Sequence, residues 1–410
     1  MQLLSGLRVV DMSHVIAGPM ASLYLANMGA DVIKIERVQG GDVLRNMKPA
    51  EPPTDYISLN AGKRSLAIDL RDPQAQKIVH DLVRTADVFI ENFKPGVVAK
   101  FGLDYDTLKA VKPDLIYCSI SGYGQKGAWA GQGGYDAMIQ ALTGIALAGG
   151  EGPDAPPAKV GFPVVDIATG VLGALSILAA VLQRDRLGKG ERIDVSMVHS
   201  SLLLMYPLVT NYLTSGKQAR RTGNRGYSGS PASTTFRCHD GWLAVSANTP
   251  GQFKKMADFL GLSRLYQDPA LLDLELFNSP QASFVVARDY DAVQNALAAA
   301  LLSMSSFEAE RKLNELSVPA ARCRSAGEFI DLAKNNEEVA LPLTRYQSNE
   351  HTVTTAGLGF SFDSAEPVEP LRCAELGDDT RAILRELGLS DDSISELEER
   401  GVVGLATAVS

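Results

Sequence analysis

Short apolar runs alternate with segments of helical spacing over the first 200 residues. Apolar strands are predicted at 8–13, 31–36, 65–69, 88–91, 116–119 and 193–196. Amphipathic helices are predicted between them at 20–28, 73–85 and 137–147. Strands that alternate with helices form parallel sheets, because each connection has to cross back over the sheet. The pattern therefore predicts an α/β fold with a Rossmann-like parallel sheet.

The most apolar segment, 171–182, is predicted to be one buried helix that ends at Gly188-Lys189-Gly190. Asp166 lies where this helix begins, and Asp readily accepts hydrogen bonds from the free N–H groups of a first turn. Asp166 is therefore predicted to be a helix N-cap. A helix N-terminus also favours the ionised form of a carboxylate, which is the form of a nucleophile, so a catalytic role stays open beside the capping role.

The length of 410 residues exceeds what one core usually supports, and the composition changes after residue 200. A Gly-, Ser- and Arg-rich stretch precedes a predicted hairpin at 236–247, and helical segments follow it. The predicted organisation has four parts. They are a large Rossmann-like domain at 1–200, a linker at 201–231, a small α+β domain at 232–317, and a linker with C-terminal helices at 318–410 that returns to the large domain.

Charge narrows the choice of ligand. The net charge of -9 disfavours a nucleic-acid partner held by general electrostatics. Six cations nevertheless follow the first predicted strands: Lys34, Arg37, Arg45, Lys63, Arg64 and Arg71. Such a cluster is either a solvated surface or a docking place for a phosphate-bearing ligand at the carboxyl ends of parallel strands.

Several other sites are not supported. The four cysteines lie far apart and the five histidines are scattered, which disfavours a zinc site, a disulfide framework, a metal site or a hydrolase triad. The first strand–helix–strand unit lacks the Gly-x-Gly-x-x-Gly turn of nicotinamide-binding folds. We see no signal peptide, and the apolar run 171–182 is too short to span a bilayer, so a reducing cytoplasm is expected.

A glycine-rich segment at 122–134 lacks the Lys-Ser/Thr ending of a P-loop. It is either a mobile surface loop or a loop that lines an active site.

Eight motifs in order resemble the class III CoA-transferase family, which includes formyl-CoA and carnitine CoA-transferase-like proteins. They are Leu-Arg-Val-Val-Asp with Ala-Gly-Pro, Gly-Ala-Asp-Val-Ile-Lys-Ile-Glu-Arg, Gly-Lys-Arg-Ser-Leu-Ala-Ile-Asp-Leu, Glu-Asn-Phe-Lys-Pro-Gly, Gly-Tyr-Gly, Tyr-Asp, Val-Asp-Ile-Ala-Thr-Gly and Gly-Lys-Gly-Glu-Arg-Ile-Asp-Val-Ser-Met. The resemblance implies an interlocked homodimer that uses acyl-CoA and carboxylic acids as substrates, with no permanently bound cofactor and no metal.

The resemblance also implies the site. Asp166 is expected to be the nucleophile, which forms a mixed anhydride and then an aspartyl-CoA thioester. CoA is expected to lie against His14, Val15 and Ala17 at the pantetheine and Arg37 at a phosphate. The remaining expected contacts are Ile68 and Arg71 around adenine and ribose, Asn92, Phe93 and Lys100 along the diphosphate, and Tyr135.

Departures from the family pattern narrow the range of expected substrates and reactions. Ile16 stands where formyl-CoA transferases have a glutamine, and their run of four glycines is missing, which disfavours formyl and oxalyl substrates. An α-methylacyl-CoA racemase is an alternative on the same fold, but Tyr135 stands where its histidine would be. A non-catalytic CoA-binding protein is a further alternative. A further hypothesis is that Arg45, Arg64 or Arg225 binds the second carboxylate of a short dicarboxylic substrate.

Overall fold

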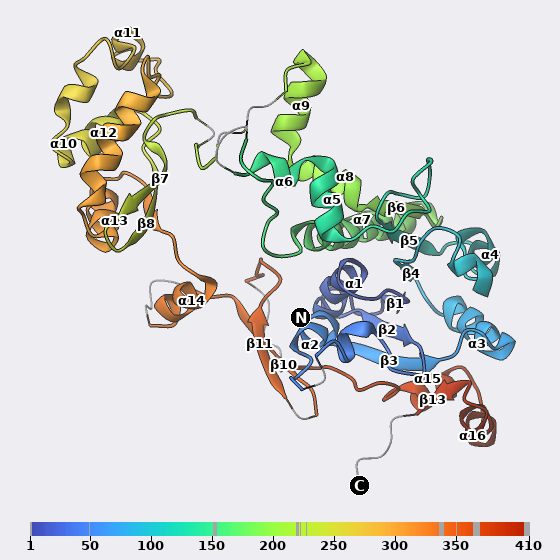
Figure 1. Cartoon of the computed structure of the whole chain (residues 1–410). Coiled ribbons are helices and arrows are strands. Elements are labelled where there is room, and N and C mark those ends of the chain that lie inside the picture. Colours follow the sequence, from blue (N-terminus) through green and yellow to red (C-terminus); the bar gives the residue numbers. More distant parts are fainter. Residues whose placement is uncertain are drawn as a thin grey trace. The chain divides into compact units, whose positions relative to one another are not determined.

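The computed structural model describes residues 2–48, 50–150, 154–218, 221, 223–226, 228–335, 340–349, 351–363 and 370–405. The chain divides into two compact units (Figure 1). The first contains Met1–Ala146, Lys159–Ala219 and Pro342–Ser410, and the second contains Leu147–Ala158 and Arg220–Leu341.

The first unit is built on a sheet of seven strands in the order β13-β3-β2-β1-β4-β5-β6. The strands are β1 (Arg8–Asp11), β2 (Asp31–Glu36), β3 (Lys63–Ile68), β4 (Val88–Glu91), β5 (Ile116–Ser121), β6 (Arg192–Ser196) and β13 (Val403–Gly404). All neighbours pair in parallel except β13, which runs antiparallel to β3. The predicted Rossmann-like parallel sheet is confirmed, and its order reverses between β1 and β4.

Helices of the first unit follow the predicted alternation. They are α1 (Ala17–Asn27), α2 (Thr54–Asn60), α3 (Pro73–Arg84), α4 (Tyr105–Val111), α5 (Asp136–Thr143), α7 (Val164–Leu187), α8 (Met197–Leu204), α9 (Tyr206–Ser215), α15 (Thr380–Glu386) and α16 (Asp391–Glu399). Two 3-10 helices, η1 (Val43–Arg45) and η2 (Val98–Phe101), and the short α6 (Ile145–Ala148) also occur in the chain before β6.

Helices cover both faces of the sheet, as Figure 1 shows for α1 and α3. Val10 and Ile33 belong to a core that also contains side chains of α3, α4, α15 and α16. Their neighbours Val9 and Val32 point the other way and pack with α1 and α7. Because both faces are buried, the strands read as continuous apolar runs instead of alternating ones.

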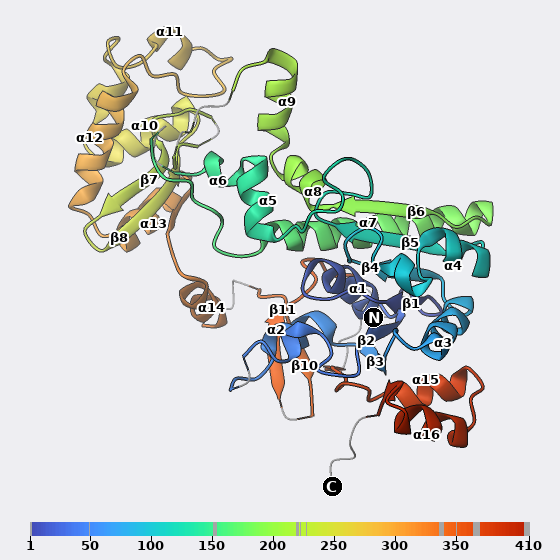
Figure 2. The ribbon, with the colours of Figure 1, turned by 45° about the vertical axis from the view of Figure 1, so that its right-hand side comes forward.

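A second sheet of the first unit has the order β11-β10-β12. Its strands are β10 (Leu343–Gln347), β11 (Thr352–Ala356) and β12 (Leu371–Arg372), and Figure 2 shows β10 and β11 beside α2. Tyr346, Val353 and Leu371 pack there with Tyr56 and Ile57 of α2. The chain after Leu341 therefore packs against its own N-terminal part.

The second unit contains an antiparallel sheet of β7 (Ser233–Cys238), β8 (Gly241–Ser246) and β9 (Ala320–Arg322). The predicted hairpin at 236–247 corresponds to β7 and β8. Its helices are α10 (Pro250–Phe259), η3 (Ser263–Tyr266), α11 (Leu274–Phe277), α12 (Tyr290–Leu302), α13 (Ser306–Glu315) and α14 (Ala326–Lys334). Phe253, Leu297 and Leu313 lie in the core between sheet and helices.

The boundaries differ from those expected. The first fifteen residues of the predicted linker 201–231 lie mostly in α8 and α9, because their apolar residues continue the helical pattern. The second unit reaches Leu341, beyond the predicted end at 317, and it includes Leu147–Ala158 from the predicted large domain 1–200. The sequence pattern locates elements, whereas unit boundaries depend on which elements pack together.

The central helix is longer than its apolar run predicts. α7 has 24 residues, so among the described residues it is one helix that is long and apolar enough to cross a membrane by length and composition. The apolar run 171–182 is itself too short for a bilayer, but the helix that contains it extends beyond the run at both ends. However, Gly170 and Gly173 of α7 pack closely against α1, and Ile177 is fully buried, as in the core helix of a folded domain.

Candidate functional site

The turn after β1 is tied to the end of β4, at the point where the strand order reverses. The His14 N–H donates to Asn92 Oδ1 at 2.9 Å, and Asn92 Nδ2 donates back to the His14 carbonyl oxygen at 2.7 Å. Ligands of open α/β sheets bind at such a point, beyond the carboxyl ends of the strands. The Asn92 amide therefore holds the turn through its backbone, in addition to the CoA contact expected from sequence.

Val15 of this turn has φ 67°, which is unusual for a β-branched residue. Such a conformation costs about 1–3 kcal/mol and persists only where the surroundings impose it. Here the Val15 N–H donates to Asp42 Oδ2 at 3.2 Å, and the same oxygen of Asp42 forms a buried ion pair with Lys34, also at 3.2 Å. Asp42 thus holds the turn in place, a role that the sequence pattern did not reveal.

Buried ion pairs form the base of the turn. Lys63 Nζ lies 3.1 Å from Asp11 Oδ2, and both side chains are almost fully buried. Burial by itself raises the pKa of Asp11, but the ammonium groups of Lys63 and Lys34 outweigh it and hold this pKa well below its usual range. Burial lowers the pKa of Lys63 to about 8. The Asp11 carboxylate also accepts hydrogen bonds from the hydroxyls of Ser13 and Ser22, so its charge is satisfied within the fold.

Two of the arginines considered for a dicarboxylate are used by the fold. Arg45 pairs with the buried Glu36 at 2.7 Å, and Arg64 pairs with Glu386 and Asp31. Arg225 lies in the second unit, where its guanidinium stacks over the Tyr290 ring. These ion pairs within the chain argue against a role of Arg45 or Arg64 in binding a substrate carboxylate.

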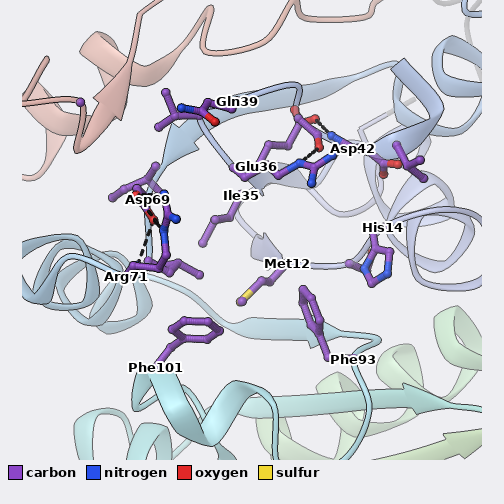
Figure 3. A pocket seen from close by; sticks show the side chains of 18 residues that line it. Met12, His14, Ile35, Glu36, Gln39, Asp42, Asp69, Arg71, Phe93 and Phe101 are labelled. Carbon is purple, nitrogen blue, oxygen red and sulfur yellow. Dashed lines mark hydrogen bonds and ion pairs between the residues drawn. The ribbon is translucent and has the colours of Figure 1, made fainter. Parts of the chain in front are cut away.

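A cavity of about 630 Å³ opens beside the turn (Figure 3). Five of its lining residues were expected from sequence: His14, Arg37, Ile68, Arg71 and Phe93. Lining residues that sequence reasoning missed include Met12, Ile35, Gln39, Asp69, Phe101 and Gly401. The cavity has the size of a site for a cofactor-sized molecule.

The cavity combines an apolar floor with polar edges. The rings of Phe93 and Phe101 lie along the lower edge in Figure 3, and Arg71 and His14 lie on opposite sides. The His14 and Phe93 ring centroids are 4.9 Å apart. The Arg71 side chain is 80% exposed and pairs with Asp69 at 2.7 Å, so it can turn toward an anion at little cost. Burial lowers the pKa of His14, which keeps the imidazole neutral at pH 7.

The other expected CoA contacts do not line this cavity. Val15 belongs to the His14 turn and Asn92 is hydrogen-bonded to it, but neither side chain lines the cavity. Ala17 is the first residue of α1. Lys100 is exposed in η2 beside Phe101, which does line the cavity. Tyr135 precedes α5 and is 73% exposed. The structure therefore gathers half of the expected set around one cavity and places two more at its supporting turn.

Asp166 is the third residue of α7, so the prediction that it caps this helix is wrong. The residue in the cap position is Pro163, which has no side-chain acceptor. The carboxylate that accepts the first-turn amides is that of Asp136, through Oδ2, from the N–H groups of Val165 at 2.7 Å and Asp166 at 3.1 Å. Within the described residues, no hydrogen bond or ion pair holds the Asp166 carboxylate, so it is available for other chemistry.

The Asp166 carboxyl has an unusual acidity. Burial, and then the charge of Asp136, raise its pKa from 3.8 to about 7. Strongly shifted carboxyl groups are typical of functional sites. Asp166 is half-buried at the start of the helix, so a reactant can reach it.

Close helix packing sets the direction in which Asp166 lies from α1. A Cβ on Gly170 would lie 2.7 Å from the Ala17 carbonyl oxygen, and one on Gly173 would lie 3.2 Å from Ala21 Cβ. The contact thus advances along α1 and α7 in the same direction. Because residues four apart share a helix face, Asp166 lies one turn before Gly170, toward the residues that precede Ala17.

No group of three or more His, Cys, Asp or Glu side chains in the described parts of the chain is arranged to hold a metal ion.

Comparison with known proteins identifies the family. The family model described as "CoA-transferase family III" matches residues 4–380. The chain is 40% identical to the succinate–glutarate CoA-transferase of Agrobacterium fabrum over 274 residues, which are 65% of this chain and 68% of that protein. It is 32% identical to the succinyl-CoA:mesaconate CoA-transferase of Haloarcula hispanica over 397 residues, or 94% of this chain and 96% of that protein. A crystal structure of a CAIB/BAIF family protein from Brucella suis superposes with a TM-score of 0.78 at 32% identity, covering 93% of this chain and 98% of that one.

Proposed function

The chain belongs to CoA-transferase family III, and we propose that it moves CoA from the acyl-CoA of a dicarboxylic acid to a second carboxylic acid through a covalent intermediate on Asp166. Relatives named for succinate, glutarate and mesaconate support the dicarboxylic substrate class. The observation that carries the proposal is the free, half-buried Asp166 carboxylate on the turn of α7 that lies toward His14.

The reaction proceeds in four balanced steps. An Asp166 oxygen attacks the thioester carbonyl carbon, the C–S bond breaks, and a mixed anhydride and a CoA thiolate result. The thiolate attacks the Asp166 carbonyl carbon and releases the donor acid, which leaves an aspartyl-CoA thioester. The acceptor carboxylate attacks the Asp166 carbonyl carbon of this thioester, expels the thiolate and forms a second mixed anhydride between Asp166 and the acceptor. The thiolate then attacks the acceptor carbonyl and regenerates Asp166, so the thioester energy is conserved.

The acidity of Asp166 suits both directions of this cycle. The nucleophile must be ionised, and with a pKa of about 7 it is mostly ionised above neutral pH. A carboxylate with a raised pKa is more basic and therefore more nucleophilic than an ordinary one. The N-terminal end of α7 stabilises negative charge as it develops on the attacked carbonyl.

CoA fits the cavity beside the His14 turn. Its adenine and pantetheine have apolar surfaces that match Ile68, Phe93 and Phe101, while Arg37 and Arg71 provide positive charge for phosphates. His14, at the edge nearest α1, lies on the path from the cavity to Asp166.

The glycine-rich segment 122–134 is proposed to cover the intermediate. Its ends meet closely, since a Cβ on Gly122 would lie 2.9 Å from the Gly134 Cα. The Gln125 N–H donates to Asp194 Oδ2 at 2.9 Å, which fixes one side of the loop. A loop closed at its base shields an anhydride from water, and its backbone N–H groups provide an oxyanion site.

We also propose that the protein is a homodimer. Several large apolar side chains of α7, α8 and α9 are exposed on the first unit: Leu175, Leu182, Leu203, Leu204, Tyr206 and Leu213. An apolar surface of this kind is typical of a subunit interface.

Four free cysteines, three of them buried, support a reducing cytoplasm as the compartment.

The test is mass spectrometry of the intact protein after mixing with succinyl-CoA and trapping with hydroxylamine. We expect a hydroxamate at Asp166 that is absent from Asp166→Ala and present in Asp185→Asn, a variant of an exposed carboxylate on the same helix. If the protein forms no adduct but exchanges the α-proton of an acyl-CoA for deuterium in deuterated water, it is instead a racemase.

A further inference from the structure

The start of α7 is held by a side chain from another helix. Helices begin with N–H groups that lack a partner within the helix, and a Ser, Thr, Asp or Asn just before the helix usually accepts them. Pro163 stands there, and Asp136 of α5 accepts the N–H groups of Val165 and Asp166 in its place. The backbone N–H of Asp166 therefore donates a hydrogen bond to the Asp136 carboxylate.

Asp136 is itself fixed by a buried amide. Gln140, which is fully buried one turn further along α5, donates from Nε2 to Asp136 Oδ1 at 2.5 Å. Its carbonyl oxygen Oε1 accepts the N–H of Val160 at 2.8 Å. One carboxylate and one amide thus hold both the segment that leads to α7 and its first turn.

The Asp136 carboxylate also acts on the charge of Asp166. Burial is the larger cause of the raised pKa of Asp166, and Asp136 adds to it. Among the described charged groups on α1, α5 and α8, the helices that pack against α7, Asp136 is the one that contributes to this shift. Repulsion between the two carboxylates ends once Asp166 is acylated, because an anhydride or thioester is neutral.

We propose that Asp136, supported by Gln140, is a positioning residue of the transfer reaction: it fixes the first turn of α7 so that the Asp166 carboxylate meets the thioester, and its charge favours the acylated form of Asp166. The proposal rests on the proposed role of Asp166 as nucleophile. Asp136 takes no part in bond making, since both its oxygens are occupied by N–H donors.

The hydrogen-bond pattern gives a test by exchange of partners. In Asp136→Asn, the single remaining oxygen still accepts the two α7 amides, but the new NH₂ group faces the Gln140 NH₂ group. Turning the Gln140 amide over only moves the conflict to Val160. In the double variant Asp136→Asn with Gln140→Glu, the new amide donates to the new carboxylate, which also accepts the Val160 N–H. Every hydrogen bond is restored while the charge moves from residue 136 to residue 140, one turn further along α5.

We expect Asp136→Ala to lower kcat about 100-fold, since a displacement of about 1 Å has this effect on a reacting group. The KM for acyl-CoA should stay within about threefold, because Asp136 does not line the CoA cavity. Asp136→Asn should also lose kcat, and the double variant should recover most of it. The acid limb of its pH profile should lie below that of the wild type, since Asp136 no longer raises the pKa of Asp166. Asp106→Asn, in the first turn of α4, is the control.

Trapping with hydroxylamine separates the two proposals. An adduct at Asp166 in the wild type with unchanged kcat in Asp136→Ala, or a melting temperature that falls while kcat stays constant, overturns the positioning role alone. A double variant as slow as Asp136→Asn also contradicts it. Absence of the wild-type adduct overturns the nucleophile and, with it, the role of Asp136.

Discussion

Replacing Asp166 by Asn is expected to stabilise the folded protein above neutral pH while it abolishes transfer. Burial, followed by the charge of Asp136, raises the pKa of Asp166 from 3.8 to about 7. The folded state therefore favours the protonated carboxyl. Stability from this group is complete below its unfolded pKa and is lost as the pH rises through about 7. The amide of Asn has no charge to bury at any pH.

The size of the effect follows from the pKa difference. A shift of roughly three units corresponds to about 4 kcal/mol at pH 8 as an upper limit. Because the side chain is only half-buried, solvent screens its charge, and we expect about 1–2 kcal/mol. For a unit of this size that gain raises the melting temperature by about 2–8 °C.

The measurement is thermal unfolding of wild type, Asp166→Asn and the surface control Asp185→Asn at several values of pH. The gain of Asp166→Asn should be largest at pH 8, shrink as the pH falls from 7 toward 4, and be absent from Asp185→Asn. An Asp166→Asn protein that is equally stable or less stable at pH 8, or whose difference from wild type is independent of pH, would refute the account of a desolvated, repelled carboxylate.

Three further predictions concern rate and packing. The transfer rate at saturating acyl-CoA should fall below about pH 7 with the titration of one group, because Asp166 becomes protonated; a steady-state profile that stays flat down to pH 5 contradicts this. Gly170→Ala should lower the melting temperature by the equivalent of about 1–3 kcal/mol, since its methyl meets the α1 backbone, while Gly327→Ala, with open space around it, should not. Lys63→Met should cost about 3–5 kcal/mol in urea unfolding, because it leaves the buried Asp11 unpaired; a loss below about 1 kcal/mol would show that Asp11 is not charged.

The sequence pattern determined the parallel sheet because buried strands and amphipathic helices carry a local signal. The strands 31–36 and 88–91 occur at the predicted residues, and the break at 240 gives the predicted turn between β7 and β8. The same periodicity does not show which elements pack together. The sequence pattern therefore missed the 24-residue length of α7 and the helical part of the predicted linker.

The sequence by itself also determined the chemistry-bearing motifs, since the resemblance named Asp166 and five residues that line the cavity. Only the tertiary structure decided how they are held. Asn92 pairs with His14, Asp42 holds the strained Val15, and Asp136 accepts the backbone N–H of Asp166. These contacts join residues that are 27 to 78 positions apart. A hydrogen bond between distant residues leaves no periodic trace in the chain, so the group that caps α7 is identified by its coordinates and not by its neighbours in sequence.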